Sequence, residues 1–147
     1  MTASRLGLER LLRIRKEALD TSQRALAASL AAEAEAEAML RAAEEAIRRE
    51  HGAAVDLAST DTAVEAYARW LPLGLRARRD AEASVLSAQA SSTHARAHVT
   101  SARSAVEAVS KLLDAQLEAE RLSRDRRAQA ALDEIAQRRA REGARRP

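Results

Sequence analysis

Apolar residues recur every seven positions along much of the chain. In the first half, Leu12, Leu19, Leu26, Leu40 and Ile47 keep this spacing, with Glu33 as the one polar member of the row. A second row runs beside the first through Leu11, Ala18, Ala25, Ala32, Met39, Ala46 and Ala53. In the second half, Val99, Val106 and Leu113 repeat at seven, while Ala102 and Val109 fill the alternate row. Apolar heptads form the seam between packed helices, so the pattern predicts two long helices that face each other.

The strongest helix-breaking cluster lies in the middle of the chain, at residues 70–74. Pro72 disfavours helix at Leu71, and Gly74 tolerates a turn. We therefore expect one all-α domain over residues 1–147, a long two-helix antiparallel coiled-coil hairpin. Its first arm is expected at about 4–69, its turn at about 70–74, its second arm at about 75–142 and a basic tail at about 143–147. This register places Ile47 opposite Val99, Leu26 opposite Leu122 and Leu12 opposite Ile135.

The first predicted arm has one irregular stretch. His51 and Gly52, followed by polar residues 59–62, weaken the helix, and Thr62 with Glu65 matches a capping box. The sequence predicts a bend or a frayed turn between residues 52 and 61.

The composition argues against an enzyme with a deep apolar pocket. The chain has 147 residues, of which 37 are alanine, and its aromatic residues are limited to Tyr67 and Trp70. It contains neither a phosphate-binding glycine-rich loop nor a Gly-x-Ser-x-Gly elbow, and its lack of cysteine excludes thiolate chemistry. We expect a non-enzymatic protein without a cofactor.

The three histidines allow two interpretations. His94 and His98 are four residues apart and share a helix face, and the predicted register brings His51 near both. Three imidazoles could bind zinc. The alternative is that all three are ordinary surface residues of the helices.

Basic residues gather towards both ends of the chain. One group is Arg5, Arg10, Arg13, Arg15 and Lys16; the other is Arg121, Arg124, Arg126, Arg127, Arg138, Arg139, Arg141, Arg145 and Arg146. In the predicted hairpin both groups lie at the same tip, which suits an acidic partner. The alternative is that they only keep the helices soluble. Nucleic acid is not the expected partner, because stacking aromatics and base-reading motifs are absent.

The predicted turn carries the aromatic residues of the chain. Tyr67, Trp70, Leu71 and Leu73 form an apolar group there, which either anchors a partner or plugs the end of the hairpin. No apolar run has the length of a membrane span, and the basic start lacks the apolar stretch of a signal peptide. We expect a cytoplasmic protein without direct membrane insertion.

Two segments resemble the FliJ family of flagellar type III export proteins, which is related to the YscO-type stalk proteins. Residues 5–15, RLGLERLLRIR, are similar to the opening Leu-x-x-Leu-Leu-x-Leu-Arg pattern of the family. Residues 126–136, RRAQAALDEIA, resemble its closing Glu-x-Lys-x-Leu-Asp-Glu-x-Ala pattern, although Ala128 and Ala130 stand where charged residues are common. The length and the two-arm layout also fit the family.

The resemblance implies a stalk that serves bacterial motility. In this family, a two-helix coiled coil promotes assembly and activity of the hexameric export ATPase, contacts the membrane-embedded export gate, and binds export chaperones. The implied location is the cytoplasmic face of the inner membrane, at the export apparatus. The implied ATPase-tip residues are Leu8, Leu12, Arg13, Arg126, Arg127, Leu132, Asp133 and Glu134. The implied gate-side residues are Tyr67, Trp70, Leu71 and Leu73.

Two other functions are compatible with the residues alone. One is a generic coiled-coil adaptor or dimerising scaffold, which would pair the long seams of two chains. The other is a basic coiled coil associated with nucleic acid.

Overall fold

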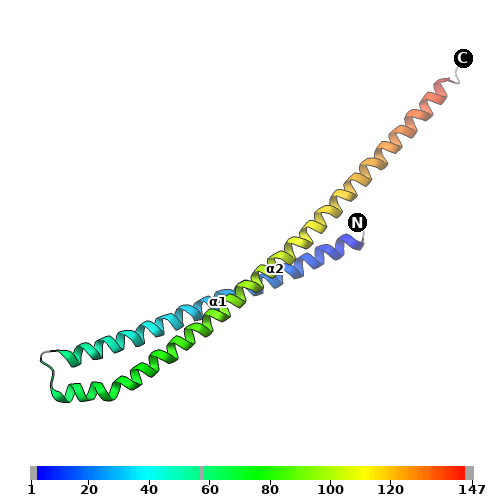
Figure 1. Cartoon of the computed structure of the whole chain (residues 1–147). Coiled ribbons are helices and arrows are strands. Elements are labelled where there is room, and N and C mark those ends of the chain that lie inside the picture. Colours follow the sequence, from blue (N-terminus) through cyan, green and yellow to red (C-terminus); the bar gives the residue numbers. More distant parts are fainter. Residues whose placement is uncertain (1–2, 57, 145–147) are drawn as a thin grey trace. The chain divides into compact units, whose positions relative to one another are not determined.

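Two helices account for nearly all of the described chain (Figure 1). The computed structural model describes residues 3–56 and 58–144. Helix α1 spans Ala3–Val55 and helix α2 spans Asp61–Ala144. They pack against each other, which confirms the predicted all-α helical hairpin. The chain divides into two compact units: a turn unit of residues 18–102, and a terminal unit formed by residues 1–17 together with residues 103–147.

The chain reverses between Val55 and Asp61, and the prediction of a turn at 70–74 is wrong. Asp56 organises this connection, because its carboxylate accepts a hydrogen bond from the Ala58 amide at 3.2 Å and its carbonyl accepts one from the Ser59 amide at 2.9 Å. Thr60 then caps α2, with its hydroxyl 3.4 Å from the Ala63 amide that donates to it. The stretch predicted as a bend therefore contains the reversal of the chain. Its helix cap is Thr60 and not Thr62.

The cluster at residues 70–74 is helical throughout. Pro72 lies inside α2, several turns after the helix begins. The helix tolerates it there because its neighbours are packed: Gly74 is buried, and Trp70 and Leu71 are half-buried. Burial of these side chains offsets the hydrogen bond that proline cannot donate.

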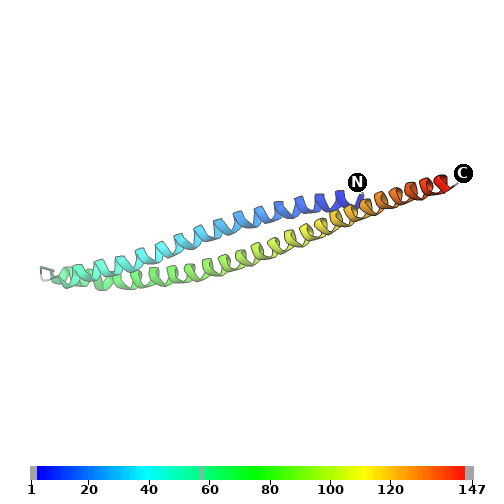
Figure 2. The same cartoon turned by 90° about the horizontal axis from the view of Figure 1, so that it is seen from above.

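In the turn unit, α1 and α2 lie side by side in opposite directions (Figures 1 and 2). The first predicted row of α1 is confirmed, since its members in this unit are half-buried. The second predicted row is wrong, because five of its seven members are exposed, including Met39 at 60%. Its place in the seam is taken by Ser22, Ser29, Ala36 and Ala43. On α2 the seam is formed by Ala81, Val85, Ala88, Ser92, Ala95, Val99 and Ala102.

Small side chains make this seam narrow. Ser92 is fully buried and Val99 is 5% exposed. Ser92 satisfies its hydroxyl by donating to the Gln89 carbonyl at 3.1 Å. Glu33 is the weak point of the row, because its Oε2 atom is buried without a hydrogen-bond partner. The seam thus combines close packing with little apolar area per layer.

The predicted register between the helices is also wrong. In the turn unit, Ala25 and Ala95 line the same groove, and the ring of His51 lies 5.8 Å from that of Tyr67. The prediction had placed Leu26 opposite Leu122. In the structure, the part of α2 that faces Leu26 lies about four heptads earlier in the sequence. A heptad pattern repeats every seven residues, and such a slide keeps apolar residues facing each other.

Gly74 gives a direct test of the packing around the aromatic residues. A Cβ atom at this position would lie 2.6 Å from Cη2 of Trp70, too close for any real contact. We expect Gly74→Ala to displace the indole into water and to shift the fluorescence of Trp70, the one tryptophan of the chain, to longer wavelength. Gly52→Ala is the matched control, because nothing lies within 4 Å of its added Cβ. That control should leave the emission unchanged and gain about 0.5–1 kcal/mol from better helix propensity. Unchanged emission in Gly74→Ala would contradict the described packing.

Candidate partner-binding surfaces

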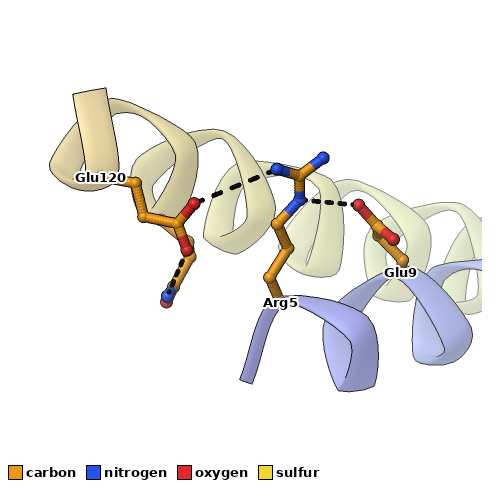
Figure 3. Close-up of polar contacts among 4 residues, drawn as sticks. Arg5, Glu9 and Glu120 are labelled. Carbon is orange, nitrogen blue, oxygen red and sulfur yellow. Dashed lines mark hydrogen bonds and ion pairs between the residues drawn. The ribbon is translucent and has the colours of Figure 1, made fainter. Parts of the chain in front are cut away.

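An ionic cluster marks the place where α1 and α2 cease to pack on each other in the terminal unit. The Arg5 guanidinium donates to Glu9 at 2.9 Å and lies 4.0 Å from the Glu120 carboxylate of α2 (Figure 3). Both Arg5 and Glu120 continue the heptad rows of their helices, so charged residues occupy the last layer of the seam. α2 then continues from Glu120 to Ala144, beyond the start of α1.

The residues implied for the ATPase tip fall into two separate groups. Leu8 and Leu12 are half-buried in the terminal unit, while Arg13 is exposed. The members on α2 are all exposed and lie past Glu120: Arg126, Arg127, Leu132, Asp133 and Glu134. The expectation that the two basic ends share one tip is therefore wrong, because α1 begins beside Glu120 and leaves the rest of α2 uncovered. Arg145 and Arg146 lie outside the described residues.

The uncovered end of α2 is stabilised by contacts within the helix. All residues from 124 to 144 are exposed. Arg138 pairs with Glu134 at 2.6 Å, and Gln129 donates to Asp133 at 3.0 Å, both one turn apart. Such pairs stabilise a solvated helix by a few tenths of a kcal/mol each. Residues 121–144 carry seven arginines and four carboxylates, a net charge of +3.

One face of this end continues the seam of the hairpin. A shallow groove of about 420 Å³ runs along Ala119, Leu122, Ser123, Arg126, Arg127 and Ala130. Ser123, Arg127 and Ala130 follow the heptad rows that pack on α1 earlier in α2, and Ala119, Leu122 and Arg126 lie beside them. Leu132 and Ile135 lie further along and are 61% and 47% exposed. Apolar side chains on a helix without a packing partner indicate a binding surface.

The gate-side residues lie in the first turns of α2 and not in the connection itself. The rings of Tyr67 and Trp70 stack with centroids 6.4 Å apart, and His51 meets Tyr67 edge-on at 5.8 Å. Tyr67, Trp70 and Glu50 help to line a groove of about 420 Å³ between the helices of the turn unit. Leu71 is half-buried, whereas Leu73 is 66% exposed. Part of this group therefore packs within the hairpin and part faces solvent.

The three histidines do not meet. His51 lies against Tyr67, whereas the rings of His94 and His98 lie 4.5 Å apart. Among the described residues, no group of three or more His, Cys, Asp and Glu side chains is placed to hold a metal ion. The hypothesis of a three-histidine zinc site is therefore wrong, because it depended on the incorrect register.

The exposed flanks of the helices carry local ion pairs. The Arg48 guanidinium donates to Glu45 at 2.6 Å and lowers the pKa of that carboxyl. Lys111 lies 2.8 Å from Glu107, which raises the pKa of the lysine and lowers that of the glutamate. These pairs connect adjacent turns of one helix, so they support the helices and do not form a site. Within residues 3–56 and 58–144, no helix has the length and hydropathy of a membrane span.

One protein-family model covers almost the whole chain. The family model described as "Flagellar FliJ protein" matches residues 4–145. The chain belongs to the FliJ family. The match to FliJ includes both helices and the uncovered end of α2. No curated protein and no solved structure matches the chain.

Membership in the FliJ family connects the hairpin to flagellar protein export. It makes this chain a coiled-coil protein associated with flagellar type III export. The residues implied by the resemblance to FliJ are thereby placed in a structure: one set on the uncovered end of α2, one set near the turn, and Leu8 and Leu12 within the packed seam. No pattern in the sequence assigned Ala130 to the first set, because its exposure depends on where α1 begins.

Proposed function

We propose that this FliJ-family chain is the coiled-coil stalk that promotes assembly and activity of the hexameric export ATPase. The observation that carries the proposal is the end of α2 beyond Glu120, where Leu122 and Ala130 line a groove that α1 does not cover and the net charge is positive. A helix with an apolar stripe and flanking arginines suits a cleft between subunits whose lining is acidic. The chain acts by binding and not by catalysis.

The turn unit supplies the second contact of the proposal. Its exposed Leu73 and the Tyr67–Trp70 stack form the apolar surface that meets the export gate at the cytoplasmic face of the inner membrane. Export chaperones are the third proposed class of partner. These assignments follow the family, and the exposure of Leu73 supports the gate contact.

The primary experiment mixes the purified chain with its cognate export ATPase. We expect a complex on size-exclusion chromatography and a rise in ATP hydrolysis. The absence of both would remove the proposed role. The complex should weaken as salt is raised from low to physiological concentration, since exposed charges are screened within about 8–10 Å.

Charge reversal at the uncovered end tests which part of the chain binds the ATPase. Arg126→Glu combined with Arg127→Glu places two carboxylates on the groove face. We expect this variant to bind the ATPase roughly tenfold more weakly, because two attractive contacts become repulsive. Isothermal titration calorimetry measures the change.

The matched control makes the same charge change elsewhere. Arg76 and Arg79 are exposed on α2 in the turn unit, and Arg76→Glu with Arg79→Glu should leave ATPase affinity unchanged. Equal loss in both variants would show that only net charge matters, which contradicts a specific surface at residues 119–130.

A further inference from the structure

His94 and His98 form a two-nitrogen pair on the surface of the turn unit. They are one helical turn apart on α2, and both side chains are exposed. Their Nε2 atoms lie 3.0 Å apart, and their rings meet edge to face with an interplanar angle of 89°. At this distance one Nε2–H can donate to the lone pair of the other, and the tautomers of the two rings decide which ring donates.

Two imidazole nitrogens this close together can also bind one divalent transition-metal ion. With metal–nitrogen distances of about 2.0–2.1 Å, two nitrogens 3.0 Å apart subtend an angle of about 94° at the metal. That angle fits adjacent positions of a square-planar or octahedral ion. A tetrahedral ion needs about 109°, which corresponds to nitrogens about 3.3–3.4 Å apart. For nitrogen ligands, affinity rises from Ni²⁺ to Cu²⁺ and falls again at Zn²⁺, so Cu²⁺ is expected to bind most tightly.

The surroundings of the pair leave room for the remaining ligands. His94 and His98 line a groove of about 380 Å³ between α1 and α2. Ser22 and Ser29 of α1 and Ser91 of α2 line the same groove, and their hydroxyl groups can hydrogen-bond to metal-bound water. No lysine or arginine lines it, so no fixed cation opposes a divalent ion there.

We propose that His94 and His98 bind one divalent transition-metal ion, with Cu²⁺ preferred and water completing its coordination. The metal replaces the hydrogen bond between the two Nε2 atoms, and each neutral ring then carries its proton on Nδ1 and binds the metal through the Nε2 lone pair. Because the two ligands lie one turn apart, the bound ion bridges adjacent turns of α2 beside Ser22 and Ser29 of α1. Binding to the folded helix then raises the thermal stability of the turn unit. The site does not depend on the export role of the chain.

Calorimetry on the full, tag-free chain tests the site with the metal alone. We expect CuCl₂ to bind with 1:1 stoichiometry and a micromolar dissociation constant, with NiCl₂ and ZnCl₂ weaker. His94→Ala and His98→Ala should each weaken Cu²⁺ binding by at least about tenfold, because one nitrogen ligand remains. His51→Ala is the matched control and should bind Cu²⁺ like the unchanged chain, since His51 lies against Tyr67.

A second measurement separates binding at the pair from binding elsewhere. Cu²⁺ should raise the unfolding temperature of the unchanged chain and of His51→Ala, and should not raise that of the double variant lacking His94 and His98. Equal Cu²⁺ affinity in the double variant and the unchanged chain would overturn the proposal, as would the absence of any bound Cu²⁺ in the micromolar range. Circular dichroism without metal confirms that each variant is folded.

Discussion

Removal of residues 124–147 is expected to abolish stimulation of the export ATPase while the hairpin stays folded. Every residue from 124 to 144 is exposed, so the truncation takes away helix but no described tertiary packing. The ion pair of Arg5 with Glu120, which marks the end of the seam, remains. Helical signal should fall in proportion to the residues removed, and the unfolding temperature should change by no more than a few degrees.

A full-length variant separates the contribution of apolar contacts from that of charge. Leu132→Gln with Ile135→Gln keeps every arginine of the uncovered end and removes its two most distal large apolar side chains. We expect ATPase stimulation to fall, because exposed apolar side chains on an unpaired helix contribute to binding when a partner covers them. If the truncated chain still stimulates the ATPase fully, the uncovered end of α2 is not the binding surface.

Substitution of Pro72 by alanine is expected to stabilise the protein by about 3 kcal/mol, the usual cost of proline in a helix interior. Pro72 lies inside α2, where it cannot donate a hydrogen bond to the Ala68 carbonyl and its ring crowds that carbonyl. Alanine restores the hydrogen bond and has the highest helix propensity. Denaturant unfolding followed by circular dichroism measures the gain.

Thr93→Ala provides the comparison for this effect. Thr93 is an exposed position in the interior of the same helix, so its substitution changes helix propensity alone, by less than about 0.7 kcal/mol. A gain at Pro72 no larger than at Thr93 would contradict the continuous helix through residues 70–74. Partner binding by Pro72→Ala then shows whether the local geometry at the proline matters for the gate-side surface.

The sequence was sufficient to predict two long helices and one packed face of each, although it misplaced the turn between them. Leu19, Leu26 and Leu40 face α2 as their seven-residue spacing predicts, and Val99 and Val109 are among the most buried residues of the chain. The spacing works because a helix with a heptad repeat presents one stripe to its partner wherever that partner lies. The second stripe was misassigned because alanine occurs on both sides of the true seam and cannot mark a face.

The position of the turn depends on how the free-energy cost of a proline inside a helix compares with the gain from seam packing. The spacing of apolar residues does not contain that comparison. Proline within a helix costs about 3 kcal/mol, which is less than the packing of many seam layers contributes. The breakers at 70–74 were therefore overridden. The chain reverses between Val55 and Asp61 because Asp56 and Thr60 accept hydrogen bonds from the amides of Ala58 and Ala63. Both Asp56 and Thr60 can be recognised in the sequence as residues that favour turns and caps. Nothing in the sequence shows that the turn forms there and not at Pro72.

The sequence by itself determined an all-helical chain, its principal seam and the positive charge near both ends. Only the tertiary structure decided the register, since a heptad seam slid by whole heptads keeps its apolar contacts and the correct pairing is set by where the turn forms. That register separates His51 from His94 and His98, places Arg5 beside Glu120, and leaves the end of α2 without a packing partner. The candidate ATPase-binding surface is a consequence of this register, because the exposed seam face exists only where α1 is absent.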